Sequence, residues 1–434
     1  MKLAWKLRGD KVIWIIVVLL AMVSVLAVFS SSTYLANTRH VHKTVIFLEQ
    51  TRSVLFGFLA LAICYIIPLS IYRNLSFVAY GAAVAMLVML FIPGFAEIKN
   101  EAVRGLKVGG ITFQVFEFVK VAIVLYIARA MEKWEDCRHS FKQFALKLLL
   151  PIAVICILIL PNSFSSTFLV GGISFLVLIF MDTDWKNILL TALIALVLAG
   201  AAFGIYDNFV KGKPKEELNK VEKIFNRFGV FENRIEEWKA ARKAKEAAKS
   251  GIAVAESNET LKVKIEEDLQ SKNAKVAISQ GGLFGKGPGK STQRFSLSMA
   301  FSDFIYAFIV EEYGLLLGGI GVLLLYLIFQ FRCIRLCTRC SQTFSSAVVV
   351  GLSFLITCQA FLHILVNVRL LPVTGQTLPL VSHGGTAYLI LSGAFGIILS
   401  VSKQLEKQRE RDEAKDKEIE SAQNIINGKD TFDN

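Results

Sequence analysis

The run VIWIIVVLLAMVSVLAVFSS at residues 12–31 follows a short basic segment that carries Lys2, Lys6, Arg8 and Lys11. A helix needs about 20 mostly apolar residues to cross the hydrocarbon core of a bilayer, and this run supplies them. A secretory signal peptide has a shorter apolar core and a small-residue cleavage site, and no such site stands out here. We therefore expect a retained membrane-spanning helix near the start of the chain.

The composition of the whole chain points in the same direction. Of its 434 residues, 54% are hydrophobic and 19% are charged, with a mean hydropathy of +0.53. Average proteins have about 25% charged residues, so this composition excludes a large soluble enzyme, a disordered chain and a nucleic-acid-binding domain. The net charge of +13 indicates basic cytoplasmic ends and contacts with anionic membrane lipids rather than with nucleic acid.

Hydropathy divides the chain into a series of long apolar runs, and we predict an all-α polytopic membrane protein with about ten transmembrane helices. The predicted spans are 12–31, 53–71, 76–96, 112–131, 144–161, 165–182, 187–206, 304–331, 343–366 and 380–401.

An even number of spans places both termini on one side of the membrane, and basic loops identify that side as the cytoplasm. The N-terminal segment, the loops 132–143 and 332–342 and the tail 403–434 are rich in Lys and Arg. We therefore predict a membrane domain over 1–402 and a charged cytoplasmic tail over 403–434. The large loop 207–302, between the seventh and eighth spans, is then extracytoplasmic.

The large loop contains two features of interest. Phe231, Ile235 and Trp238 recur at helical spacing, which fits either an amphipathic helix on the membrane surface or a solvated charged helix. Near its end stands GGLFGKGPGK at 281–290. Exposed amides and Lys286 in such a stretch can bind phosphate oxygens. The favoured interpretation from the pattern alone is a flexible turn that leads the chain back to the membrane. The spacing excludes a P-loop.

Ionisable residues inside spans are costly and are usually functional or paired. The predicted fourth span holds Gln114, Glu117 and Lys120. Glu117 and Lys120 are three residues apart and therefore share one helix face. The pattern favours a neutralised internal pair, and the alternative is the polar wall of a cavity.

Asp303 stands where the large loop meets the predicted eighth span. It fits an N-cap, because Asp commonly starts helices. It fits equally a carboxylate at the water–lipid boundary, which can act as a general base on a sugar hydroxyl or help to hold a divalent cation on a pyrophosphate. Glu311 and Glu312 lie deeper in the span, so we expect both to face the protein interior.

The stretch NVRLLPVTGQTLPLVSHGGT at 367–386 precedes the last predicted span. Its two prolines and three glycines at membrane depth favour a broken backbone, which persists only when it is buried in protein or lines a polar cavity. Arg369 needs an acidic partner or an anionic ligand there. A substrate site between helices is the favoured interpretation, and a kinked packing helix is the alternative.

Seven cysteines imply no disulfide, because none falls in a predicted outer loop. Cys333, Cys337 and Cys340 cluster in a basic cytoplasmic loop. A metal site would need a fourth ligand and better spacing, so reduced loop thiols are the favoured interpretation.

Three blocks of sequence together resemble the SEDS family of polytopic cell-wall proteins (FtsW, RodA, SpoVE). They are AISQGGLFGKGPG at 277–289, SDFIYA with EEYG between 302 and 314, and LPVTG through LPLVSHGGT between 371 and 386. The amino-acid sequences of these blocks are more similar to those of the FtsW division branch than to those of RodA.

Two weaker matches depart from the family pattern. Arg104 and the stretch 113–120 resemble the family's "RW…FQPSE" block, with Val115-Phe116 in place of Pro-Ser. PNSFSST at 161–167 stands where many relatives carry an acid, and here the acid is missing. That departure leaves Asp303 as the acidic candidate.

The resemblance implies a peptidoglycan glycosyltransferase that polymerises lipid II, an undecaprenyl-pyrophosphoryl disaccharide-peptide, for septal wall synthesis at the outer face of the cytoplasmic (inner) membrane. It implies that Asp303 is the catalytic carboxylate. Arg104, Lys286 and Arg369 would hold pyrophosphate, and Ser382 and His383 would contact substrate. Gln114, Glu117, Lys120, Glu311 and Glu312 would shape the cavity.

The resemblance also implies partners and a cofactor. The partners are a single-span class B penicillin-binding transpeptidase and other membrane proteins of the division machinery, and a divalent cation (Mg²⁺ or Mn²⁺) could assist the leaving pyrophosphate. Three rival hypotheses stay open: a lipid II flippase, because broken helices and buried charges also fit transporters; a RodA-like elongation polymerase; and a catalytically silent scaffold.

Overall fold

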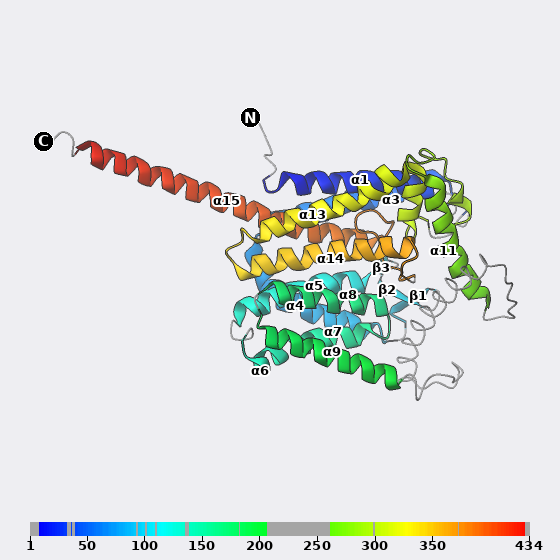
Figure 1. Ribbon diagram of the computed structural model, residues 1–434, viewed down its shortest axis with the longest axis horizontal. Helices are drawn as coiled ribbons and strands as arrows, with labels where there is room; N and C mark the ends of the chain where they lie inside the picture. The colour runs from blue at the N-terminus through cyan, green and yellow to red at the C-terminus, as the bar shows by residue number, and fades with distance from the viewer. Residues whose placement is uncertain are drawn as a thin grey trace, which may run out of the picture.

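The computed structural model describes residues 8–32, 36, 40–92, 94–99, 102–108, 111–134, 139–181, 183–205, 261–297, 300–371 and 373–429. Its helices lie side by side in an elongated bundle (Figure 1). The helix predicted around Phe231, Ile235 and Trp238 falls outside the described residues.

Seven helical segments within the described residues are long and apolar enough to cross a membrane. The chain is therefore a multi-pass membrane protein, and the part that the structure describes is helical apart from one small sheet. These segments are α1 (Lys11–Ser31), α3 (Lys43–Ile66), α4 (Leu69–Met89), α6–η2–α7 (Phe141–Phe144, Ala145–Leu149 and Leu150–Ile159), α12–η5–α13 (Ile305–Tyr313, Gly314–Ile320 and Gly321–Cys337), α14 (Thr343–Asn367) and α15 (Thr386–Lys429).

Three further helices complete the bundle: α5 (Val115–Lys133), α8 (Phe164–Phe180) and α9 (Trp185–Ile205). Glu117 and Lys120 lower the hydropathy of α5, and α8 has only 17 residues. Each of the predicted runs overlaps a helical segment, although the last run, predicted from residue 380, begins as a helix only at Thr386.

The predicted boundaries of the second and third spans are wrong. They were expected at 53–71 and 76–96, whereas α3 ends at Ile66 and α4 begins at Leu69. Pro68 is the physical reason. A residue before proline is pushed out of the helical region, and Ile67 has φ −59° and ψ 127°.

The predicted start of the fourth span is also wrong, because a small antiparallel sheet occupies that position. β1 (Ala96–Lys99), β2 (Ala102–Val108) and β3 (Ile111–Phe113) pair in the order β1-β2-β3, and α5 begins only at Val115. A side chain at Gly105 of β2 would place its Cβ 2.2 Å from the carbonyl oxygen of Phe113, so this pairing needs glycine.

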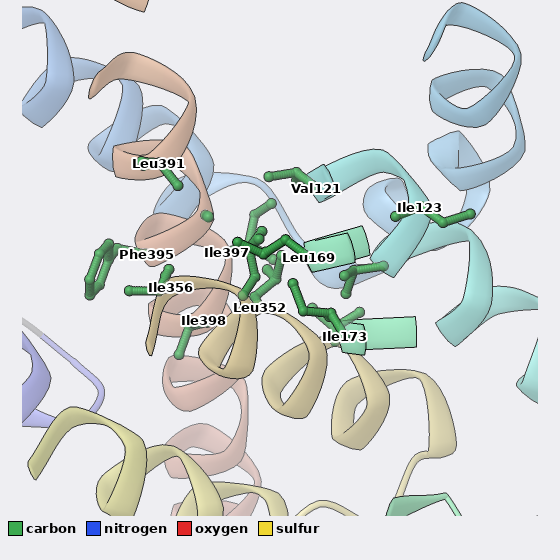
Figure 2. Close-up of a cluster of buried hydrophobic side chains, with 14 of the residues drawn as sticks. Val121, Ile123, Leu169, Ile173, Leu352, Ile356, Leu391, Phe395, Ile397 and Ile398 are labelled. Atoms are coloured by element: carbon green, nitrogen blue, oxygen red, sulfur yellow. The ribbon is translucent and has the colours of Figure 1, made fainter. Parts of the chain in front are cut away.

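The hydrophobic core lies between α5, α8, α14 and α15, where Val121, Leu169, Leu352 and Phe395 gather (Figure 2). Within an apolar window of 18 residues in each helix, 72% of α14 and 78% of α15 is buried, against 22% of α4. The last two helices are therefore central, and α4 is left with a broad apolar face for lipid.

The two ends of the bundle differ. α11 (Leu261–Gly281) and the sheet lie at one end, and α15 runs far beyond the bundle at the other (Figure 1). At that second end the backbone N–H of Asp10 donates to Ser402 Oγ (2.8 Å), and Arg332 pairs with Asp10 (2.6 Å). The segment predicted as a separate tail from residue 403 continues α15 without a break through Lys429.

Candidate active site

The segment between α14 and α15 is non-helical, as predicted, and it lies at the α11 end of the bundle (Figure 1). α14 ends at Asn367 and α15 starts at Thr386, so the alternative of one kinked helix is wrong. Leu380 is buried and adopts a left-handed φ of 58°. Side chains of neighbouring helices bond the carbonyls on either side of Leu380. Tyr326 donates to the Pro379 carbonyl, and Ser24 donates to the Val381 carbonyl (2.9 Å).

A buried charge pair, Glu117 and Lys120 of α5, contacts the broken segment, which is the non-helical stretch between α14 and α15. Lys120 is 1% exposed, and its Nζ lies 2.7 Å from Glu117 Oε1. The same ammonium donates to Gln359 Oε1 of α14 (2.7 Å) and to Gln376 Oε1 of the broken segment (3.3 Å). The geometry matches an internal neutralised pair that also joins α5 to the broken segment.

Three polar residues of α14 were missed in the sequence analysis. Gln359, His363 and Asn367 follow one another at intervals of four, and all are buried. Gln359 Nε2 donates to the Thr377 carbonyl (3.1 Å). The carbonyl of Gln376 lies 2.8 Å from His363 Nδ1, so this nitrogen carries the proton. Polar residues every four positions in an apolar run form a single polar face, and that spacing was the available signal.

The turn that carries Asp303 is fixed by its backbone. Three successive carbonyls accept hydrogen bonds from the segment 367–383. The Phe301 carbonyl accepts from the backbone N–H of His383 (2.9 Å), that of Ser302 from Ser382 Oγ (2.8 Å), and that of Asp303 from Asn367 Nδ2 (3.0 Å). These three bonds bring the predicted residues Asp303, Ser382 and His383 together.

Asp303 is not the N-cap of α12. The helix begins at Ile305, and the N-cap position belongs to Phe304, which makes no side-chain cap bond. Asn367 Oδ1 accepts the N–H of Ala307 (3.0 Å), which is the role that a capping side chain ordinarily has. Asp303 itself is partly exposed beside the buried network, so it is accessible to water.

The Gly-rich stretch forms a second cluster around the end of α12. Lys286 Nζ lies 2.7 Å from Glu311 Oε1, and Ser291 and Thr292 also donate to Glu311. The N–H of Gly289 donates to Glu312 Oε1 (3.0 Å). Glu311 and Glu312 are buried, as predicted, but they hold the turn in place. A phosphate at Lys286 would have to compete with Glu311.

The remaining predicted residues lie at the same end of the bundle. Gln50 Oε1 lies 2.6 Å from His383 Nδ1, and Gln114 Nε2 donates to the Gly384 carbonyl (3.4 Å). Arg369 is partly buried, with a left-handed φ of 61°. Arg104 belongs to β2, and its side chain is outside the described part of the structure.

The described residues contain no group of three His, Cys, Asp or Glu side chains that could hold a metal ion. Cys333, Cys337 and Cys340 do not form such a group in the described part of the chain, and their assignment as reduced thiols stays a prediction. Burial raises the pKa of Cys340 to about 12, so this thiol stays protonated at neutral pH when no metal is bound. Since Glu311 is already bonded to Lys286, Ser291 and Thr292, Asp303 does not complete a cation site with it.

Comparison with known families decides the relationship. The family model for FtsW, RodA and SpoVE, described as cell cycle proteins, matches residues 10–232 and 252–407. The chain belongs to this family. The match spans the buried pair, the Asp303 turn and the broken segment, so the site described above lies within the shared part of the FtsW/RodA/SpoVE fold.

Individual relatives cover nearly the whole chain. It is 27% identical over 394 residues to a probable peptidoglycan glycosyltransferase FtsW of Bacillus subtilis (strain 168), covering 89% of this chain and 88% of that one. It is 28% identical over 415 residues to a probable peptidoglycan glycosyltransferase FtsW of Alcanivorax borkumensis, with 93% and 96% covered.

Solved structures share the fold. A chain from a peptidoglycan synthase complex that coordinates polymerization and crosslinking aligns with a TM-score of 0.65 and 20% identity, over 92% of this chain and 98% of that one. The rod shape determining protein RodA of Thermus thermophilus aligns with a TM-score of 0.59 and 19% identity, over 93% and 98%.

Proposed function

We propose that this FtsW/RodA/SpoVE family member is a peptidoglycan glycosyltransferase that polymerises lipid II. The observation that carries the proposal is the fixation of Asp303. Its turn is held at three successive carbonyls, while its side chain is partly exposed at the end of a buried polar network. A carboxylate held in this way is suited to act as a positioned general base.

In the proposed reaction, the acceptor's sugar hydroxyl oxygen attacks the anomeric carbon of the donor. The bond from that carbon to the pyrophosphate oxygen breaks, and the pyrophosphate leaves with the electron pair. Asp303 takes the hydroxyl proton, and the anomeric centre inverts. Arg369, Arg104 and Lys286 are the proposed contacts for the pyrophosphate, because cations and forked guanidinium groups match its oxygens.

The proposed membrane arrangement follows from the ends of the bundle. We assign ten spans, with α5, α8 and α9 crossing the bilayer beside the seven long apolar segments. The α11 end faces the outside of the cytoplasmic membrane, and the basic end with the α15 extension faces the cytoplasm. Lipid-linked substrates would then reach Asp303 laterally from the outer leaflet.

The proposed biological setting is septal wall synthesis, with a class B penicillin-binding transpeptidase and other division proteins as partners. The named FtsW relatives and the structural likeness to a chain of a polymerising and crosslinking complex support it.

The test is polymerisation of lipid II by the purified chain, alone and with its transpeptidase, on a gel that resolves glycan strands. Asp303→Asn is compared with a control, Asp184→Asn. Asp184 directly precedes α9, and its Oδ1 lies 3.2 Å from Nδ1 of His139. We expect strands from wild type and Asp184→Asn and none from well-folded Asp303→Asn. Glycan strands from Asp303→Asn as well as from wild type and Asp184→Asn would refute the role of Asp303.

The flippase hypothesis predicts another outcome. No strands from any variant, together with lipid II transport across liposome membranes by wild type, would replace the polymerase with a transporter. Addition of a chelator to the same reactions tests the divalent cation: loss of strands that Mg²⁺ or Mn²⁺ restores would establish the requirement.

A further inference from the structure

The turn after α11 exposes two large apolar side chains. Phe284 is 82% exposed, and its neighbour Leu283 is also exposed. Single exposed apolar residues are ordinary on protein surfaces. This pair differs because it adjoins a further exposed apolar group on another segment.

That segment is η5, which follows α12 within the long apolar span Ile305–Cys337. Leu315, Leu316 and Leu317 are exposed there, and Leu317 reaches 77%. The acidic residues of this span, Glu311 and Glu312, are buried, whereas the three consecutive leucines are exposed, which presents them to lipid. These three leucines therefore mark a part of the bilayer-facing surface.

Backbone hydrogen bonds join the turn to this surface. The N–H of Leu315 donates to the Gly282 carbonyl (2.9 Å), and that of Leu316 donates to the Leu283 carbonyl (3.2 Å). Gly314 allows the close approach, since an added Cβ would lie 2.4 Å from the Leu283 carbonyl oxygen. Leu283 and Phe284 thus lie at the same depth as the start of the lipid-facing leucines.

Cationic residues follow the turn on its polar side. Lys290 is exposed, and Arg294 Nη1 donates to the Gly289 carbonyl (2.7 Å). An apolar tip with adjacent cations is the arrangement of an interfacial membrane anchor, in which the cations meet anionic headgroups.

We propose that Leu283, Phe284 and Leu315–Leu317 form an outer apolar patch that inserts into the leaflet at the α11 end of the bundle. The occupant of the patch is the lipid bilayer itself. The Gly-rich turn is then a membrane anchor for α11, which fixes the height of the Lys286–Glu311 cluster relative to the headgroups. The proposal does not depend on the enzymatic activity.

The test is the depth of a spin label in liposomes of phosphatidylethanolamine and phosphatidylglycerol. Phe284→Cys is made in a chain without its native cysteines and is labelled with a nitroxide. Relaxation of the label by oxygen, which partitions into lipid, is compared with relaxation by a water-soluble nickel complex. Leu317→Cys is the lipid reference, and Lys272→Cys on the exposed part of α11 is the aqueous reference.

We expect the label at 284 to favour oxygen, as at 317, and to lie about 5–10 Å below the phosphates. A label at 284 that favours nickel, as at 272, would overturn the proposal. Shielding from both reagents would also overturn it, because another protein segment would then cover the patch. Leu283→Cys provides an independent second position, so the test does not depend on the folding of one variant.

Discussion

Replacing Lys120 with methionine should strongly destabilise the protein, because it leaves the buried carboxylate of Glu117 without a cation and with only a long hydrogen bond from Gln359 Nε2 (3.4 Å). The three N–H bonds of the Lys120 ammonium meet three acceptors, at 2.7 Å (Glu117), 2.7 Å (Gln359) and 3.3 Å (Gln376). Methionine fills similar space but donates to none of them. Within the described residues, the second carboxylate oxygen of Glu117 has no hydrogen-bond partner that could compensate.

The expected loss is about 3–5 kcal/mol, the usual cost of removing one partner from a buried ion pair. The assay is unfolding by SDS titration in mixed lipid–detergent micelles, followed by tryptophan fluorescence. The double variant Glu117→Gln/Lys120→Met should lose less than the sum of the two single variants, with a coupling of roughly 0.5–3 kcal/mol. This difference is the coupling free energy between Glu117 and Lys120.

A surface pair provides the matched control. Arg409 Nε lies 2.6 Å from Glu413 Oε1, but the two side chains are 75% and 55% exposed. Arg409→Met should therefore lower the free energy of unfolding by only about 0–1 kcal/mol. The reasoning would be refuted if Lys120→Met lost no more stability than Arg409→Met. It would equally be refuted if the double variant lost the full sum of the single changes, since the pair would then be uncoupled.

Three further predictions follow from the same end of the molecule and from its cytoplasmic loop. Asn367→Ala frees the Asp303 carbonyl and should lower strand synthesis about tenfold to a hundredfold in a rate assay, through misplacement of the base; an unchanged rate would contradict this. Gly314→Ala, at φ 79°, should lower the thermal midpoint of unfolding, whereas Gly321→Ala at the first residue of α13, where φ is −58° and an added Cβ makes an ordinary contact, should not; equal midpoints would exclude strain at Gly314. With Cys340 as the single thiol, alkylation should quicken about tenfold per pH unit up to pH 10 without a plateau, because its pKa is raised to about 12 and only the thiolate reacts; a plateau near pH 8.5 would contradict burial.

Hydropathy predicted the helices well because an apolar run of span length has few alternatives to a membrane helix. It failed at β1–β3, where short alternating stretches between spans carry too little signal to distinguish a strand from a loop. It also misplaced the boundaries near Pro68, where apolar residues continue on both sides of the break and hydropathy alone cannot locate it.

The candidate site was predicted in part. Asp303, Ser382 and His383 were identified from the sequence, and the structure brings them to one turn. Their mutual positions depend on Asn367, which the sequence analysis missed. The four-residue spacing from His363 marks Asn367 as part of a polar face, but it does not reveal that Asn367 bonds a carbonyl 64 residues away and an N–H 60 residues away.

The membrane class, the approximate positions of the helices, the Glu117–Lys120 pair and the family resemblance could all be predicted from the chain alone. These depend on composition and on short-range spacing, which the chain displays directly. That Asn367, rather than Asp303, caps α12, and that Glu311 holds Lys286, became visible only in the folded protein. Such assignments are choices among competing hydrogen-bond partners, and they are settled only when distant segments are packed close enough to exclude water.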